Sequence, residues 1–152
     1  MIQRKQTVFL LLAAIIGLVC LILPIGSFIP EKLGAGYTMF NLWVIDGNGG
    51  VTFGVAPLFG ILFAEVILSL ITVFLYNNRK LQIKLCSVNI FLLVLWYAAY
   101  VALAMINKDT YGAAFKVEYS AVFPLVSLIL IVMARNGVKA DEALVRAADR
   151  IR

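Results

Sequence analysis

Four long runs of apolar residues dominate the chain, and most of its polar residues lie in the segments between them. The runs cover residues 7–28, 55–76, 85–106 and 117–134. A bilayer core of roughly 30 Å needs about 20 helical residues. The first three runs have 22 residues each and the fourth has 18. The pattern therefore predicts an all-α membrane protein in which four transmembrane helices form a bundle.

The segments between the apolar runs differ in charge. Ten of the 13 Lys and Arg residues lie in the N-terminal segment, the second connection and the C-terminal tail, and the other three are Lys32, Lys108 and Lys116. Membrane proteins keep their Lys- and Arg-rich segments in the cytoplasm. We therefore expect a multi-pass protein with both termini cytoplasmic. The net charge of +5 then reflects topology and does not indicate nucleic-acid binding.

The first outward loop has the composition of a small β-hairpin. Its segment Tyr37–Val44 is rich in aromatic and branched residues, Asp46–Gly50 is a cluster of turn-forming residues, and Val51–Phe53 is long enough to return. We expect an extracytoplasmic hairpin that lies over the bundle.

The chain divides into two parts by composition. Residues 1–136 form the four-span domain, and residues 137–152 follow a break at Asn136 and Gly137. The second part has apolar residues on one face and charged residues on the other, which predicts a cytoplasmic amphipathic helix. Its apolar face includes Leu144, Ala148 and Ile151, and we expect this face to bind a protein partner or to lie on anionic lipid headgroups.

A carboxyl group stands near the middle of the second span. Glu65 shares a helical face with Ser69 and Thr72, and Asn89, Leu93 and Trp96 follow one face of the third span. An ionised carboxylate at the bilayer midplane costs at least ~2.5 kcal/mol, so Glu65 is expected to be protonated or partnered inside the bundle. Trp96 lies at a similar depth, and its indole N–H is a candidate donor to Glu65. We take Glu65, Ser69, Thr72 and Trp96 as the intramembrane polar site.

The composition excludes several kinds of chemistry. The chain contains no His, and its two cysteines, Cys20 and Cys86, lie at different depths in their spans. These facts exclude His-dependent nucleophilic catalysis, His-ligated haem or zinc, and dithiol redox chemistry. We expect no catalytic residues, no cofactor and no bound metal.

Three function classes remain open. The chain is most consistent with a non-enzymatic membrane protein that associates with a protein partner, through the C-terminal tail or the first extracytoplasmic loop, or acts as an accessory subunit. The first alternative is a small proton- or cation-coupled transporter that uses Glu65, and the second is an enzyme that acts on lipid. Glu65 is compatible with the first two of these classes. A polar residue inside the membrane either fixes helix packing, as in the association class, or handles ions, as in the transporter.

Both ends of the chain carry short motifs. Met1–Thr7 leads into Leu10–Ala14, and Lys139–Glu142 is followed by Ala148–Arg152. Together with the length and the number of spans, these motifs resemble an uncharacterised family of small four-span inner-membrane proteins of Bacteroidetes, a domain of unknown function. The resemblance implies a bacterial inner membrane and carries over no catalytic residue.

Overall fold

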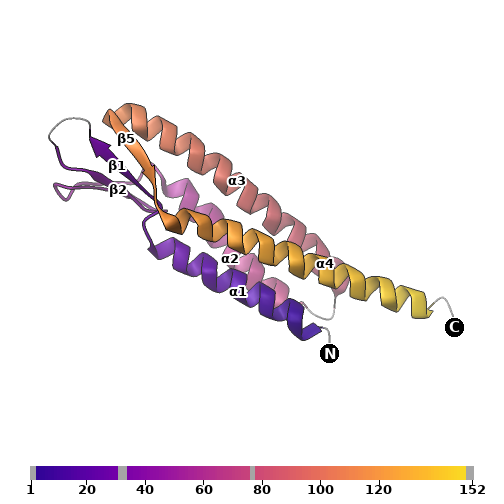
Figure 1. Ribbon diagram of the computed structural model, residues 1–152. Coiled ribbons are helices and arrows are strands. Elements are labelled where there is room, and N and C mark those ends of the chain that lie inside the picture. Colours follow the sequence, from indigo (N-terminus) through magenta and orange to yellow (C-terminus); the bar gives the residue numbers. More distant parts are fainter. Residues whose placement is uncertain (1–2, 31–33, 76–77, 150–152) are drawn as a thin grey trace.

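Four long helices make up most of the protein. The computed structural model describes residues 3–30, 34–75 and 78–149. In this part of the chain each helix is long and apolar enough to cross a membrane. The helices are α1 (Gln3–Ile22), α2 (Ala56–Phe74), α3 (Arg79–Tyr111) and α4 (Phe123–Asp149) (Figure 1). The predicted four apolar helices are therefore confirmed.

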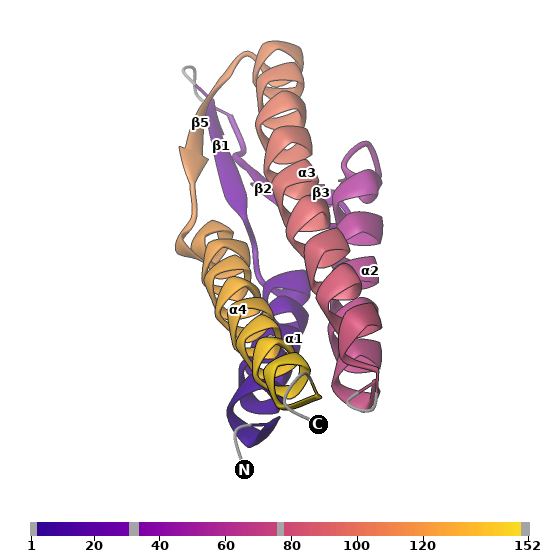
Figure 2. The same cartoon turned by 90° about the vertical axis from the view of Figure 1, so that its right-hand side faces the viewer.

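The helices pack as a four-membered ring. α1 contacts α2 and α4, and α3 contacts the same two helices from the other side (Figure 2). Each helix contributes a fully buried aliphatic side chain to the centre, and these are Leu10, Leu62, Leu93 and Ile131. Large apolar side chains also cover the outer faces of all four helices, which suits contact with lipid.

The first and fourth helices differ in extent from the predicted spans. α1 ends at Ile22, six residues before the predicted end at residue 28. The helix stops here because Pro24, which follows closely, has no backbone N–H with which to continue it. α4 begins at Phe123 instead of residue 117, with Pro124 in its first turn, where a missing N–H costs nothing. Two strands take up parts of these predicted spans and of the adjoining predicted loops, and they are β1 (Gly26–Pro30) and β5 (Ala113–Val117). A short 3-10 helix, η1 (Tyr119–Val122), then leads into α4.

A five-stranded antiparallel sheet lies at one end of the bundle (Figure 1). Its other strands are β2 (Tyr37–Met39), β3 (Val44–Asp46) and β4 (Val51–Thr52), and the strand order is β4-β3-β2-β1-β5. The predicted turn at Asp46–Gly50 joins β3 and β4, which form the hairpin. The first strand of the prediction, Tyr37–Val44, is divided in the structure between β2 and the beginning of β3. The hairpin of β3 and β4 is one edge of a larger sheet. Toward the other edge, β1 and β5 pair along five residues. These two strands link the sheet to the helices of the bundle.

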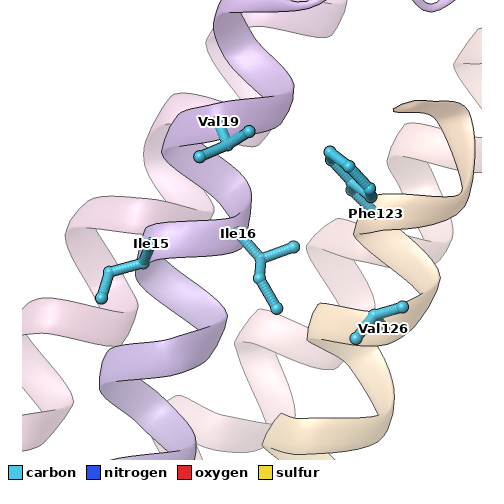
Figure 3. A pocket seen from close by; sticks show the side chains of 5 residues that line it. All are labelled: Ile15, Ile16, Val19, Phe123 and Val126. Atoms are coloured by element: carbon cyan, nitrogen blue, oxygen red, sulfur yellow. The ribbon is translucent and has the colours of Figure 1, made fainter.

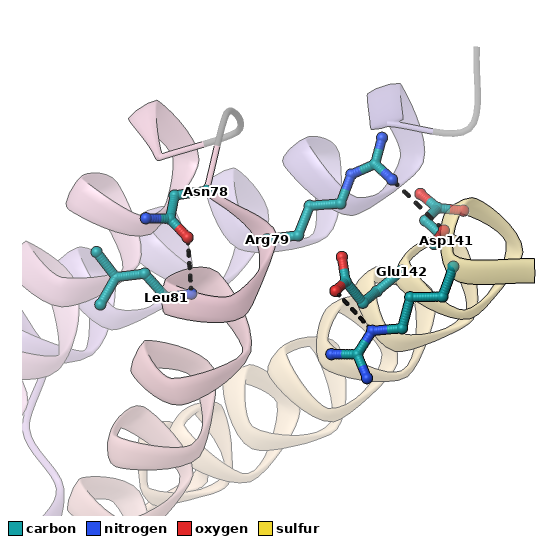
Figure 4. A network of polar contacts seen from close by, with 6 residues as sticks. Asn78, Arg79, Leu81, Asp141 and Glu142 are labelled. Carbon is teal, nitrogen blue, oxygen red and sulfur yellow. Dashed lines mark hydrogen bonds and ion pairs between the residues drawn. The ribbon is translucent and has the colours of Figure 1, made fainter. Parts of the chain in front are cut away.

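α3 is the longest helix and has a defined cap at each end. The Oδ1 atom of Asn78 accepts from the backbone N–H of Leu81 at 3.4 Å (Figure 4), and Gly112 closes the other end in a left-handed conformation with φ of 55°. The 33 residues between these caps carry α3 past the end of the predicted span at residue 106. Its last turns therefore lie beside β1 and β5 (Figure 2).

The break predicted at Asn136 and Gly137 is wrong, because α4 is continuous from Phe123 to Asp149. A Cβ atom at position 137 would lie 3.0 Å from Cγ of Gln6, so glycine allows α1 to approach α4 closely there. The next residue, Val138, is buried. The predicted tail helix is thus the C-terminal part of α4, and it extends beyond the beginning of α1 (Figure 1).

Candidate functional site in the helix bundle

Glu65 lies at one end of a short hydrogen-bonded chain that runs through Ser69 of α2 to Asn89 of α3. Its side chain is fully buried, and the Ser69 hydroxyl donates to Glu65 Oε1 at 3.0 Å. The Asn89 Nδ2 atom of α3 in turn donates to Ser69 Oγ at 2.7 Å. In the part of the chain that the structure describes, Glu65 Oε2 and Asn89 Oδ1 have no hydrogen-bond partner. The structure thus brings Glu65 and Ser69 together and adds Asn89 to them.

The backbone of α1 closes the other side of Glu65. A Cβ atom on Gly17 would lie 2.7 Å from Glu65 Oε2 and 2.7 Å from Cγ2 of Val66. Both distances are shorter than real Cβ contacts allow, so only glycine permits this approach of α1 to α2. Three helices therefore meet at the Glu65 carboxyl group, which leaves little free volume on the Gly17 side.

Trp96 does not donate to Glu65, and the predicted contact is wrong. Its Nε1 atom donates instead to Asn41 Oδ1 at 3.1 Å, and its ring stacks on Tyr100 with centroids 5.2 Å apart. The reason is that the connection between β2 and β3 places the fully buried Asn41 side chain beside Trp96. The buried polar residues of the bundle therefore form two groups, one around Glu65 and one around Asn41.

Asn41 joins three helices, and the sequence analysis did not identify it as a site residue. Its Nδ2 atom donates to the backbone carbonyl of Cys20 near the end of α1 at 2.7 Å. The backbone carbonyl of Asn41 accepts from the backbone N–H of Phe59 in α2 at 3.1 Å. The third connection is the Trp96 indole of α3. Only a three-dimensional contact between residues 55 positions apart shows this role.

Further side chains satisfy the backbone where α1 ends and β1 begins. The Tyr100 hydroxyl donates to the carbonyl of Ile25 at 2.7 Å, and the Ser120 hydroxyl donates to the carbonyl of Pro24. Buried backbone groups need such internal partners because a packed apolar interior offers no others. The polar residues at the sheet end of the bundle thus complete the backbone hydrogen bonding around the end of α1.

Thr72 was also assigned to the polar site, but it does not join Glu65. Its side chain is fully buried, and its Oγ1 atom donates to the carbonyl of Leu68 in the same helix at 2.6 Å. The backbone carbonyl of Thr72 accepts from Gln82 Nε2 of α3 at 3.3 Å. Thr72 therefore contributes to the contact between α2 and α3 at the end of the bundle where α2 ends and α3 begins.

Asp141 ties α4 to both neighbouring helices. Its carboxylate accepts from Nε2 of Gln6 in α1 at 2.7 Å, and its backbone carbonyl accepts from Nη1 of Arg79 in α3 at 3.4 Å (Figure 4). The next residue, Glu142, forms an ion pair with Arg146 at 3.0 Å. Asp141 therefore marks the place where α4 leaves the bundle.

The residues predicted to form a partner-binding face lie beyond Asp141. Leu144 is 64% exposed, and its neighbour Val145 is 42% exposed. Ala148 lies in the last turn of α4, and Ile151 is outside the described residues. The structure thus leaves a helix end with exposed apolar side chains, which we call the α4 tip and define as residues 142–149.

An apolar groove runs between α1 and α4. It has a volume of about 220 Å³ and is lined by Ile15, Ile16 and Val19 of α1 with Phe123 and Val126 of α4 (Figure 3). Binding sites for specific ligands combine apolar walls with a few polar groups. This groove has apolar walls alone, so it suits a lipid acyl chain without selecting a headgroup.

Among residues 3–30, 34–75 and 78–149, no three His, Cys, Asp or Glu side chains gather as a metal site would require.

Comparison with known proteins identifies the family of the chain. No curated protein shows significant similarity to the chain. The profile of a domain of unknown function, DUF4293, matches residues 2–151. Because the match covers almost the whole sequence, the chain belongs to the DUF4293 family.

Proposed function

We propose that this DUF4293 protein is a non-enzymatic integral membrane protein that binds another protein, as a partner or as an accessory subunit. We place it in the inner membrane of a bacterium, with Bacteroidetes as the source that the terminal motifs favour. The four apolar helices and the sequence without His support the proposal. The observation that carries it is the α4 tip, which leaves the bundle after Asp141 with Leu144 and Val145 exposed.

The charge pattern supports a cytoplasmic position for the α4 tip. Arg79, Lys80 and Lys84 lie at the beginning of α3, and Lys139 and Arg146 lie on the last turns of α4 at the same end of the bundle. The sheet end carries Lys108 and Lys116 among the described residues. Since Lys- and Arg-rich ends stay in the cytoplasm, both termini and the α4 tip face that compartment in this proposal.

An exposed apolar helix end in water favours a protein partner. Burying a leucine side chain contributes about 1.5–3 kcal/mol, and the bundle leaves Leu144 uncovered. Helices that insert into the membrane interface carry aromatic or several large aliphatic residues, whereas the residues of the tip that flank Leu144 and Val145 include Ala143, Ala147 and Ala148. Binding of the tip in a groove of another protein therefore explains its composition better than deep insertion into lipid.

Leu144→Asp is expected to weaken the complex while leaving the bundle intact. A charge at this position prevents burial of the face, so the amount of the specific partner that co-purifies in mild detergent should fall by about 10- to 100-fold. The measurement is quantitative mass spectrometry of proteins retained by the tagged chain after extraction from its native cells. Arg146→Ala changes the net charge by the same one unit on the opposite face of the helix and should retain the partner.

Unchanged recovery of every retained protein in Leu144→Asp would remove the α4 tip from the proposal.

The α4 tip also reports the orientation of the protein in the membrane, because trypsin cleaves after Arg146, which is exposed. We expect cleavage when trypsin is added to sealed inverted vesicles and protection in intact spheroplasts. Cleavage in spheroplasts would contradict the cytoplasmic position.

Glu65 supplies a second candidate function, proton- or cation-coupled transport. The specific observation in its favour is the Oε2 atom, which is fully buried and has no hydrogen-bond partner among the described residues. The close approach of Gly17 and the chain through Ser69 to Asn89 favour a packing role instead, since they place Glu65 at the junction of three helices. Proton flux into proteoliposomes separates the two roles, because only transport requires a group at position 65 that can bind and release a proton.

A further inference from the structure

A second pocket lies at the sheet end of the bundle, between α3 and β5. It has a volume of about 360 Å³. One wall is a single face of α3, because residues spaced by one, four and five positions along a helix lie together. The α3 residues in this wall are Tyr100, Val101, Ala104, Met105 and Lys108.

The other wall of the pocket is β5. Phe115 and Val117 line it, and alternate residues of a strand point to the same side of a sheet. Lys116 lies between them and therefore points to the opposite side. Among the described residues that line the pocket, Lys108 alone carries a charge, and its acidic neighbour Asp109 is not part of the lining.

The depth of the pocket places its charge at the level of lipid headgroups. Lys108 follows the beginning of α3 at Arg79 by 29 residues, which corresponds to about 44 Å along the helix axis. A hydrocarbon core of roughly 30 Å with its headgroup regions spans about 40–45 Å. With Arg79 at one membrane surface, the Lys108 ammonium group reaches the opposite headgroup region, while Val101 and Ala104 remain nearer the hydrocarbon.

We infer that this pocket binds one anionic phospholipid. Its phosphate lies at Lys108, and the part of an acyl chain nearest the headgroup lies along Val101, Ala104 and Met105. The inference rests on the membrane insertion that the proposed function includes. Charge complementarity carries the choice of an anionic headgroup, because the Lys108 ammonium group faces no carboxylate within the lining. The groove between α1 and α4 offers the contrast, since its walls hold no charge and fit any acyl chain.

Native mass spectrometry of the delipidated protein in detergent tests this site. We expect one phosphatidylglycerol to be retained in preference to phosphatidylethanolamine. Lys108→Gln should weaken the retention of phosphatidylglycerol about five-fold, the usual contribution of one basic residue at a membrane surface. Lys116→Gln removes the same charge from the opposite face of β5 and should bind the lipid as the unmodified protein does.

Met105→Trp provides an independent variant, because a larger side chain on the apolar wall should exclude the acyl chain without changing charge. Inorganic phosphate at the same concentration should not displace the lipid, since it lacks the chain. Equal retention of the two phospholipids by the unmodified protein would overturn the inference, and so would an equal loss in Lys108→Gln and Lys116→Gln. These outcomes do not depend on the α4 tip, so failure here is distinguishable from failure of partner binding.

Discussion

Asn41→Leu is expected to destabilise the protein by about 2–6 kcal/mol, the largest effect of any substitution we propose. Leucine has a similar size but makes no hydrogen bond. It therefore leaves the Trp96 Nε1 atom and the Cys20 carbonyl buried without their partners. Each unsatisfied buried group costs about 1–3 kcal/mol. The effect should be large because one side chain joins the end of α1 to the middle of α3.

Thermal unfolding of the purified protein in detergent measures this effect. Asn48→Leu is the matched control, because Asn48 lies in an exposed turn of the same sheet and bonds only to the Asp46 side chain among the described contacts. We expect the unfolding temperature to fall by several degrees or more in Asn41→Leu and to change little in Asn48→Leu. Equal unfolding temperatures for the two variants would show that Asn41 does not connect the helices.

Gly17→Leu is expected to destabilise the contact between α1 and α2 by about 3 kcal/mol. Its Cβ atom would lie 2.7 Å from both Glu65 Oε2 and Val66 Cγ2, so the two helices must move apart. Overpacking of this kind costs typically 1–3 kcal/mol, and leucine extends well beyond Cβ.

Gly60→Leu is the control for Gly17→Leu. Gly60 lies on α2, and a Cβ atom there would have no atom within 4 Å among the described residues. Because leucine favours helix over glycine by up to about 1 kcal/mol, Gly60→Leu should leave the free energy of unfolding unchanged or raise it. The measurement is unfolding in a detergent mixture, and equal losses for the two variants would contradict the close approach at Gly17.

Hydropathy sufficed to predict the four helices, because a helix long enough to span a bilayer requires about 20 consecutive, mostly apolar residues. It did not separate helix from strand at residues 26–30 and 113–117, where short apolar segments continue the neighbouring spans. Pro24 and Gly112 were the available signals, the first stopping α1 and the second closing α3 in a left-handed conformation. The pairing of β1 with β5 joins residues far apart in sequence, and no local pattern indicates it.

Helical periodicity placed Glu65 and Ser69 on one face, and the structure gives them a direct hydrogen bond. Periodicity does not show which loop enters the bundle, and Asn41 therefore replaced Glu65 as the partner of Trp96. Gly137 was interpreted as a break for the same reason. Its role is to admit Gln6 of α1, a contact that is visible only once the helices are packed.

Proton flux in proteoliposomes distinguishes partner binding from transport most directly. The amide of Glu65→Gln can still accept from Ser69 and pack against Gly17, so this variant should keep its stability to within about 1 kcal/mol. An amide cannot bind and release a proton, so any transport through this residue would end. We predict that the unmodified protein and Glu65→Gln show the same background flux under a pH gradient. A flux in the unmodified protein that disappears in a stably folded Glu65→Gln variant would contradict the account.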